Sequence, residues 1–262
     1  MDAATLVRHA LEALKRPLTL KEALSSVADF RIDRKKKYPL YEILMVAVCA
    51  MIDGAKGPTD FERFGKAKSK FLKKFLPLQN GIPSHDTFGR VLGKIDPRRF
   101  NAALVEWLRS ATDVTGDIIS IDGKLLRRAL TKDCRMPCIV SAHSSRTKLV
   151  IGQVKADEKS NETTAIPALL DLLYLKGAIV TIDAAGCQNF TGRCAIGCWL
   201  LEHFGRRPLR ARREDLAENL AMLRHVVLNV LRLDKSVFGG ISVKRKELAW
   251  DDDKLLSLML AA

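Results

Sequence analysis

The spacing of apolar residues changes near Gly116, and this change limits the folds open to the chain more than any other feature. Up to Arg109 the apolar side chains recur every three or four residues, which is the period of helices. After Gly116 the apolar runs become short and rich in β-branched residues, as in strands. We therefore expect an α+β fold, with a helical N-terminal domain over residues 1–112 followed by an α/β domain over 113–262.

Four strands are expected in the second half. They cover Asp117 to Asp122, Cys138 to Ala142, Leu149 to Lys155 and Ala178 to Asp183. The turn-forming residues 144–147 predict a hairpin between the second and third strands. A helix over 164–173 separates the third from the fourth, with Thr164 as its cap and Pro167 in its first turn. Three antiparallel strands, a crossover helix and a fourth strand are the opening order of a ribonuclease-H-like sheet.

The C-terminal part is predicted to be helical. An amphipathic helix is expected over 214–232, and Phe238-Gly239-Gly240 interrupts the chain after it. The stretch from Trp250 to Asp253 resembles the start of a short helix with acids in its first turn. A structural role is expected for these three aspartates, because consecutive residues on a helix do not converge on one metal ion.

The chain is basic, with 44 Lys and Arg against 30 Asp and Glu and a formal net charge of +14. Such an excess favours nucleic acid as a partner, although ribosomal and membrane-surface proteins share it. Two basic stretches stand out, Arg31 to Lys37 and Arg63 to Lys74, and the second is interleaved with Phe64, Phe71 and Phe75. Two readings are equally open: a solvated helix face with its aromatics in the core, or a face that contacts DNA.

The sequence predicts neither a membrane span nor a metal cluster built from cysteines. The N-terminus lacks the pattern of a secretory signal, so we expect a cytoplasmic protein. The longest apolar stretch, Ile43 to Ile52, is about half of the roughly 20 residues that span a bilayer, and we expect a buried helix there. The spacings Cys134-x3-Cys138 and Cys194-x3-Cys198 lack a zinc knuckle, so free thiols are expected.

Asp122 and Asp183 are the candidate chemical residues. Each ends an apolar run and is followed by small residues, so each carboxylate is expected where a buried strand passes into a loop. Two carboxylates on adjacent strands can share divalent cations, which prefer oxygen ligands. In phosphoryl transfer, two such ions stabilise the attacking and leaving oxygens. The alternative is that both aspartates only initiate turns.

Several motifs resemble one family of proteins. They are Tyr38-Pro-Leu-Tyr-Glu-Ile-Leu44, Gly81-Ile-Pro-Ser-His-Asp-Thr-Phe-Gly-Arg-Val91, Ile121-Asp-Gly-Lys124, Lys155-Ala-Asp-Glu-Lys-Ser-Asn-Glu162 with Ala165-Ile-Pro167, and Thr181-Ile-Asp-Ala-Ala-Gly-Cys-Gln188. Their order and spacing resemble the H-repeat-associated transposases of bacterial insertion sequences, from about Asp33 to Gln188. The tail resembles the same family's end through Ala217 to Leu220, Leu228-Asn229 and Trp250 to Leu256.

This resemblance implies a helical family-specific domain followed by a DDE catalytic domain with a ribonuclease-H-like fold. Asp122 would be the first catalytic acid and Asp183 the second, and both would be ligands of Mg²⁺. In such enzymes two magnesium ions activate water, and then a DNA 3′-hydroxyl, for attack on phosphodiesters. The implied partner is double-stranded DNA, no membrane is involved, and a homodimer is allowed. Lys124 and Lys155 could contact phosphate or be solvated surface lysines.

The chain departs from the family pattern after Gln188, where a further strand and a helix bearing the third acid should follow. Instead, residues 187–213 hold six Arg and no Lys, which suggests a frameshift or an internal deletion. We therefore expect 187–213 to be aberrant and to pack poorly, and the ribonuclease-H-like domain to be incomplete. The remaining acids and histidines of this region are Glu202, His203, Glu214, Glu218 and His225. Surface pairing with Arg is the favoured use of Glu214 and Glu218, and packing that of the histidines.

The sequence thus predicts a transposase-derived protein whose family activity is DNA transposition by metal-dependent strand cleavage and transfer, and whose own copy is inactive. We expect Asp122 and Asp183 side by side on adjacent strands, within about 10 Å of each other. One alternative is a non-catalytic DNA-binding protein built on the helical half. Another is a working nuclease in which Glu214 or Glu218 replaces the third acid.

Overall fold

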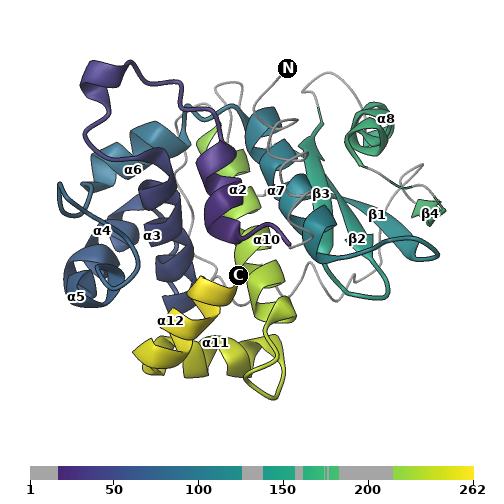
Figure 1. The fold of residues 1–262 in the computed structure, drawn as a ribbon. Coiled ribbons are helices and arrows are strands. Elements are labelled where there is room, and N and C mark those ends of the chain that lie inside the picture. Colours follow the sequence, from purple (N-terminus) through teal and green to yellow (C-terminus); the bar gives the residue numbers. More distant parts are fainter. Residues whose placement is uncertain (1–16, 126–137, 157–161, 174, 176, 183–214) are drawn as a thin grey trace.

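The computed structural model describes residues 17–125, 138–156, 162–173, 175, 177–182 and 215–262. Within these residues a body of helices lies beside a four-stranded sheet (Figure 1). The helices of the first half are α2 (Leu20–Ser26), α3 (Leu40–Asp53), α4 (Pro58–Ala67), α5 (Ser69–Leu72), α6 (His85–Leu92) and α7 (Pro97–Ala111), with a 3-10 turn at Asp33–Lys35. The helical period of the first half is confirmed in this described part.

The starts of three helices follow from local side-chain chemistry. Thr19 and Glu22 form a reciprocal capping box at α2, Ser84 accepts a hydrogen bond from the Thr87 N–H at α6, and Asp96 accepts one from the Arg98 N–H at α7. A side-chain oxygen at these positions satisfies a backbone N–H that has no partner inside the helix. Each helix therefore begins where the sequence places a capping residue.

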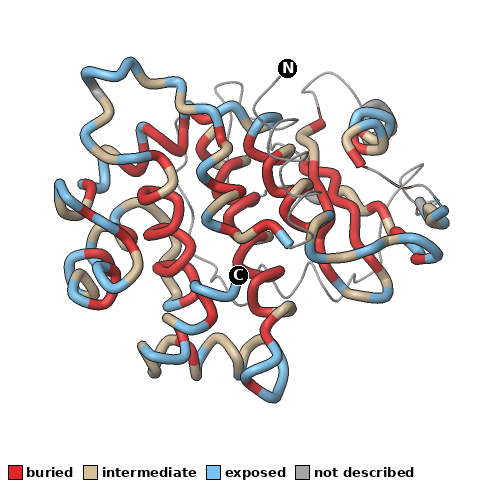
Figure 2. Tube along the Cα trace, viewed as in Figure 1, coloured by how far each residue is buried: buried red, intermediate tan, exposed pale blue. Residues whose placement is uncertain are grey.

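Helix α3 runs through the middle of the helical body. Every residue from Ile43 to Ile52 is at most 1% exposed, so the apolar run is a buried helix, as predicted. Figure 2 shows this buried band continuing from α3 through neighbouring helices to the sheet. No helix in the described residues is both long and apolar enough to cross a bilayer.

The sheet contains β1 (Ile118–Leu125), β2 (Cys138–Ser144), β3 (Val150–Lys155) and β4 (Ile179–Ile182) in the order β3-β2-β1-β4. β1 pairs antiparallel with β2, and β2 pairs antiparallel with β3, while β4 is parallel to β1. The connection from β3 to β4 contains helix α8 (Glu162–Leu172). This is the predicted order of three antiparallel strands, a crossover helix and a fourth strand.

The start of α8 differs from the prediction. The helix begins at Glu162, so Thr164 is not its cap, and Pro167 lies inside the helix rather than in its first turn. Ala165 and Leu169 of α8 and Leu173 just beyond its end are spaced four residues apart, and all three are buried. Burial of this stripe against the sheet offsets the backbone hydrogen bond that proline cannot donate.

The tail forms α10 (Leu216–Leu233), α11 (Ile241–Trp250) and α12 (Asp252–Ala261). The chain break between α10 and α11 and the short helix α12 were predicted, whereas α11 was not. Asp251 caps α12 by accepting from the N–H groups of Asp253 and Lys254, and Asp252 and Asp253 form ion pairs with Lys68 and Lys74. The structural role expected for the three aspartates is confirmed.

Helix α10 joins the two halves of the molecule. It was predicted to be amphipathic, but it is buried on most sides, because it contacts α3, α6 and α7 as well as β3. One continuous hydrophobic core therefore includes residues of the helical body, α10 and the sheet. Cys49 is a buried free thiol, and the cysteines at 134, 187, 194 and 198 lie outside the described residues.

Candidate active site on the polar face of the sheet

The two faces of the sheet can be assigned from Gly152. A Cβ atom added at Gly152 would lie 2.8 Å from Leu173 and 3.5 Å from Leu169, so this position faces α8. Gly152 is paired with Ala142, and Ala142 with Ile121, so these positions share the face covered by α8. Side chains alternate along a strand, so the neighbouring residues point to the opposite face.

That opposite face carries polar residues, and we call it the polar face. Its members are Ser120, Asp122, Ser141, His143, Gln153 and Thr181. Asp122, Ser141 and Gln153 form one cross-strand row. In the adjacent row the hydroxyls of Ser120 and Thr181 lie 3.1 Å apart and join β1 to β4. Gln153, Ser141 and His143 are only 3%, 7% and 8% exposed.

Asp122 lies half-buried on this face, but not at the end of its strand. β1 continues to Leu125, because residues 122–125 pair with residues 138–141 of β2. The predicted strand end at Asp122 is therefore wrong, since cross-strand pairing keeps the backbone extended beyond the apolar run. Oxygen-bearing side chains of Ser120, Ser141 and Thr181 share the polar face with Asp122, and such hard donors suit Mg²⁺.

Asp183 lies outside the described residues, as do Glu202, His203 and Glu214. The described register between β1 and β4 ends at the pair Ile121 and Ile182. The predicted proximity of Asp122 and Asp183 therefore stays a prediction. Within the described residues no group of three or more His, Cys, Asp or Glu side chains could hold a metal ion.

Lys124 and Lys155 occupy one row of the sheet on either side of Ile139, two residues along the strands from the row of Asp122. Lys155 ends β3 and lies near Glu218 of α10, which it affects electrostatically. Burial raises the pKa of Glu218 to about 7, and nearby Asp215 and Asp96 add to the rise, whereas Lys155 and Arg98 lower the pKa.

Glu218 is expected to pair with a neighbouring Arg on the surface, and this stays a prediction because the arginines at 206–213 lie outside the described residues. The Glu218 side chain is half-buried, and it forms no salt bridge with any described residue. The reason is that α10 lies between the helical body and the sheet. The electrostatic effect of Lys155 places Glu218 near the end of β3. β2 separates β3 from β1, the strand of Asp122.

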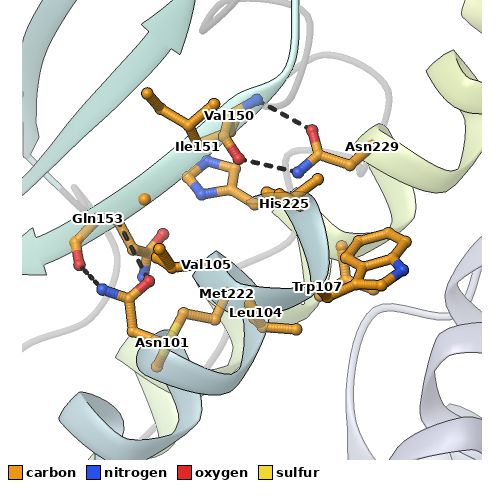
Figure 3. A pocket seen from close by; sticks show the side chains of 13 residues that line it. Asn101, Leu104, Val105, Trp107, Val150, Ile151, Gln153, Met222, His225 and Asn229 are labelled. Atoms are coloured by element: carbon orange, nitrogen blue, oxygen red, sulfur yellow. Dashed lines mark hydrogen bonds between the residues drawn. The ribbon is translucent and has the colours of Figure 1, made fainter. Parts of the chain in front are cut away.

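Two asparagines hold the free edge of β3. Asn229 belongs to the Leu228-Asn229 stretch that resembles the family, but no sequence pattern predicts this role for it or for Asn101. Asn229 of α10 accepts from the Val150 N–H at 2.9 Å and donates to the Val150 carbonyl at 2.8 Å. Asn101 of α7 makes the same pair of contacts with the backbone of Gln153 (Figure 3). Only the tertiary structure shows that these buried amides take the place of a neighbouring strand.

A small cavity of about 20 Å³ lies between α7, α10 and β3 (Figure 3). It is lined mainly by apolar side chains, with His225, Asn101 and Asn229 at its wall. This volume holds one or two water molecules rather than a substrate. His225 is half-buried at this interface, in keeping with the packing role expected for it.

The second basic stretch, Arg63 to Lys74, contains both aromatic residues and lysines, and the two kinds of residue lie in different surroundings. Phe64 and Phe71 are buried, and Phe75 is half-buried and packs edge-on against Phe71 with ring centres 5.5 Å apart. The aromatics thus belong to the core. Lys68 and Lys74 form ion pairs with the acids of α12 at 2.7 and 3.2 Å.

Comparison with known proteins gives the relatives of the chain. A family model described as DDE_Tnp_1-associated matches residues 21–108. "H repeat-associated putative transposase YhhI" of Escherichia coli (strain K12) is 45% identical over 173 residues, which are 65% of this chain and 46% of that protein. "H repeat-associated putative transposase YbfD" of the same strain is 44% identical over 175 residues, covering 68% of its length.

A shorter relative, "Inactive transposase YbfQ" of the same strain, is 44% identical over 78 residues, which are 93% of its length. The match thus spans about half of YhhI but two thirds of YbfD. No solved structure matched the chain. With this identity over so much of YbfD, the chain belongs to the family of H repeat-associated transposases.

Proposed function

We propose that this transposase-derived chain carries an incomplete ribonuclease-H-like domain, in which Asp122 and Asp183 are the remaining acids of a site for DNA strand cleavage and transfer. The observation that carries the proposal is the sheet order β3-β2-β1-β4, with Asp122 on the polar face of β1 and β4 parallel beside it. This is the order expected for a ribonuclease-H-like sheet.

The register supports the pairing of the two acids. Ile121 and Ile182 are partners across β1 and β4, and Asp122 and Asp183 are the next residues in each sequence. If the register continues by one residue, the two carboxylates lie on neighbouring strands and on the same face. Mg²⁺ held there would supply charge stabilisation for the attacking and leaving oxygens of a phosphodiester.

We propose that this copy is inactive, because a third acid is missing from the site. Glu218 lies beside β3 and is separated from Asp122 by β2, so it is poorly placed to replace the third ligand. Residues 187–213 stand where the family pattern has a further strand and the helix with the third acid, but they hold six Arg and no Lys. The loss of one electrostatic stabiliser commonly lowers a rate by about a hundredfold or more.

Nicking of a supercoiled plasmid in the presence of Mn²⁺ tests this proposal. We expect the intact protein to leave the plasmid supercoiled, with YbfD or YhhI as a positive-control candidate prepared in the same way. Strand cleavage by the intact protein that is lost in Asp122→Asn and in Asp183→Asn would contradict inactivity while supporting the two-acid site. Cleavage lost also in Glu218→Gln would identify Glu218 as the replacement acid.

A second candidate function is non-catalytic binding of double-stranded DNA through the helical half. The observation in its favour is that the helical half is a folded body whose exposed helix faces carry basic residues. We expect binding that weakens steeply as salt rises, because neutralised phosphates release counterions. A gel-shift titration of duplex DNA at several salt concentrations measures this, and binding indifferent to salt would count against it.

A further inference from the structure

The outer side of α4 and α5 carries a row of cations. Arg63, Lys66, Lys70 and Lys73 are all exposed. Arg63 and Lys66 share one face of α4, whereas Lys70 lies in α5 and Lys73 directly follows it. The two helices are separate elements: the Lys68 N–H donates to the Phe64 carbonyl at 2.8 Å and closes α4, and α5 begins at Ser69. We call these four residues the outer stripe.

The outer stripe keeps most of its charge. Arg63, Lys70 and Lys73 form no ion pair with any other residue in the described part of the chain. Lys66 pairs with Glu62 of the same helix at 2.6 Å, and exposed pairs of this kind are worth only about 0.3–0.5 kcal/mol. Lys68 and Lys74 are left out of the outer stripe because they pair with Asp252 and Asp253 of α12.

We propose that the outer stripe binds the phosphate backbone of duplex DNA, an inference that rests on the proposed function only in taking DNA as the partner. Within α4, a rise of about 1.5 Å per residue sets Arg63 and Lys66 about 4.5 Å apart along the helix axis. Phosphates follow one another every 3.4 Å or so along the axis of one strand, so cations this close together can meet neighbouring phosphates.

The chemistry of the helix favours DNA over a membrane surface. A helix that lies on a bilayer inserts an apolar face beneath its cations. Here the aromatic residues Phe64 and Phe71 point into the core and are 7% and 4% exposed. The outer stripe therefore offers charge without an apolar face that could insert between lipids.

The stripe is also separate from the candidate active site. Figure 1 shows α4 and α5 at the end of the helical body farthest from β1 and β4. A duplex bound along the stripe is thus held at a different place from one that reaches Asp122. The stripe anchors DNA regardless of whether the sheet can cut it.

The test compares two variants with the same loss of charge. In the first, Arg63→Gln, Lys70→Gln and Lys73→Gln are combined. In the control, Lys148→Gln, Lys235→Gln and Lys246→Gln neutralise three exposed lysines elsewhere on the molecule. Affinity for a short duplex is measured at several salt concentrations, after circular dichroism has confirmed that both variants are folded.

We expect the stripe variant to bind about tenfold or more weakly at low salt, and the slope of log K against log salt to fall by about 2–3. The control should keep a slope close to that of the intact protein. Equal losses in the two variants would mean that only net charge matters, and would overturn the proposal. Stripe-dependent binding to anionic phosphatidylserine vesicles in place of DNA would overturn it as well.

These outcomes are separate from those of the proposed function. If the intact protein fails to bind duplex DNA at low salt, DNA as the partner is refuted. If the intact protein binds and the stripe variant binds equally well, only the stripe is refuted. Neither result depends on whether plasmid is nicked.

Discussion

Glu218 is a carboxyl group whose ionisation the fold opposes. Burial raises its pKa to about 7 from an ordinary value of 4.5. Because this pKa is raised in the folded state, the stability that protonated Glu218 contributes is fully present below about pH 4.5. That contribution is lost as the pH rises through about 7. The ionised side chain therefore destabilises the interface of α10 above neutral pH.

We expect Glu218→Gln to stabilise the protein at pH 8, by about 1–2 kcal/mol once partial solvation is taken into account. The gain should shrink as the pH falls to 4.5, because the native glutamate becomes protonated. Urea unfolding of both proteins across this pH range measures the effect. A gain that is the same at every pH would mean that the pKa of Glu218 is not raised.

Asp117 shows the opposite behaviour. It is 3% exposed and accepts hydrogen bonds from Ser144, the Ile118 N–H and the Arg146 N–H. Burial alone would raise the pKa of Asp117, but these hydrogen bonds outweigh burial and hold the pKa below its ordinary value. The carboxylate thus ties the start of β1 to the turn between β2 and β3.

We expect Asp117→Asn to destabilise the protein at pH 7 by about 1–3 kcal/mol, because charge-assisted hydrogen bonds are lost. A lowered pKa means that the contribution of Asp117 is present above about pH 4 and is lost as the pH falls below it. The two proteins should therefore converge in acid. Asp171→Asn, at an exposed position, serves as the control in urea unfolding, and an equal effect at both positions would contradict the role of Asp117.

At the scale of elements, the edge strand β3 depends on side chains from two helices. Asn229→Ala leaves the N–H and carbonyl of Val150 without their partners. We expect a loss of about 2–4 kcal/mol and faster hydrogen exchange at the Val150 amide. Asn80→Ala, an exposed asparagine, is the matched control and should change little. Unchanged protection of the Val150 amide in Asn229→Ala would show that the asparagine does not hold the strand.

At the scale of the whole molecule, α10 makes the helical body and the sheet share one core. We expect the described halves to unfold together, although the sequence predicts domains over 1–112 and 113–262. Leu223→Ala, at a fully buried position in α10, should cost about 2–5 kcal/mol and destabilise both halves. Leu260→Ala, which changes a side chain that is 64% exposed, is the control.

Hydrogen exchange measures the two halves separately. Amides of α3 and of β1 should lose protection by similar amounts in Leu223→Ala. If the β1 amides open and those of α3 keep their protection, the two halves are independent domains and the shared core does not couple them.

The sequence by itself determined the type and order of most elements. Local chemistry was sufficient there, because a capping side chain such as Ser84 or Asp96 acts within one turn, and the period of apolar residues shows which face is buried. Helix α11 escaped prediction, since Leu248 is its only buried residue and leaves no periodic pattern. The strands were placed to within a few residues, but the extension of β1 beyond Asp122 depended on pairing with β2.

The tertiary structure alone decided which distant residues share a surface. It placed Asp122 in a row with Ser141 and Gln153, and it placed Glu218 near the end of β3. It also paired Lys68 and Lys74 with acids of α12, although in the sequence these lysines lie among the residues of the outer stripe. The physical reason is that sheet register and helix packing join residues far apart in the chain, and local spacing carries no record of those contacts.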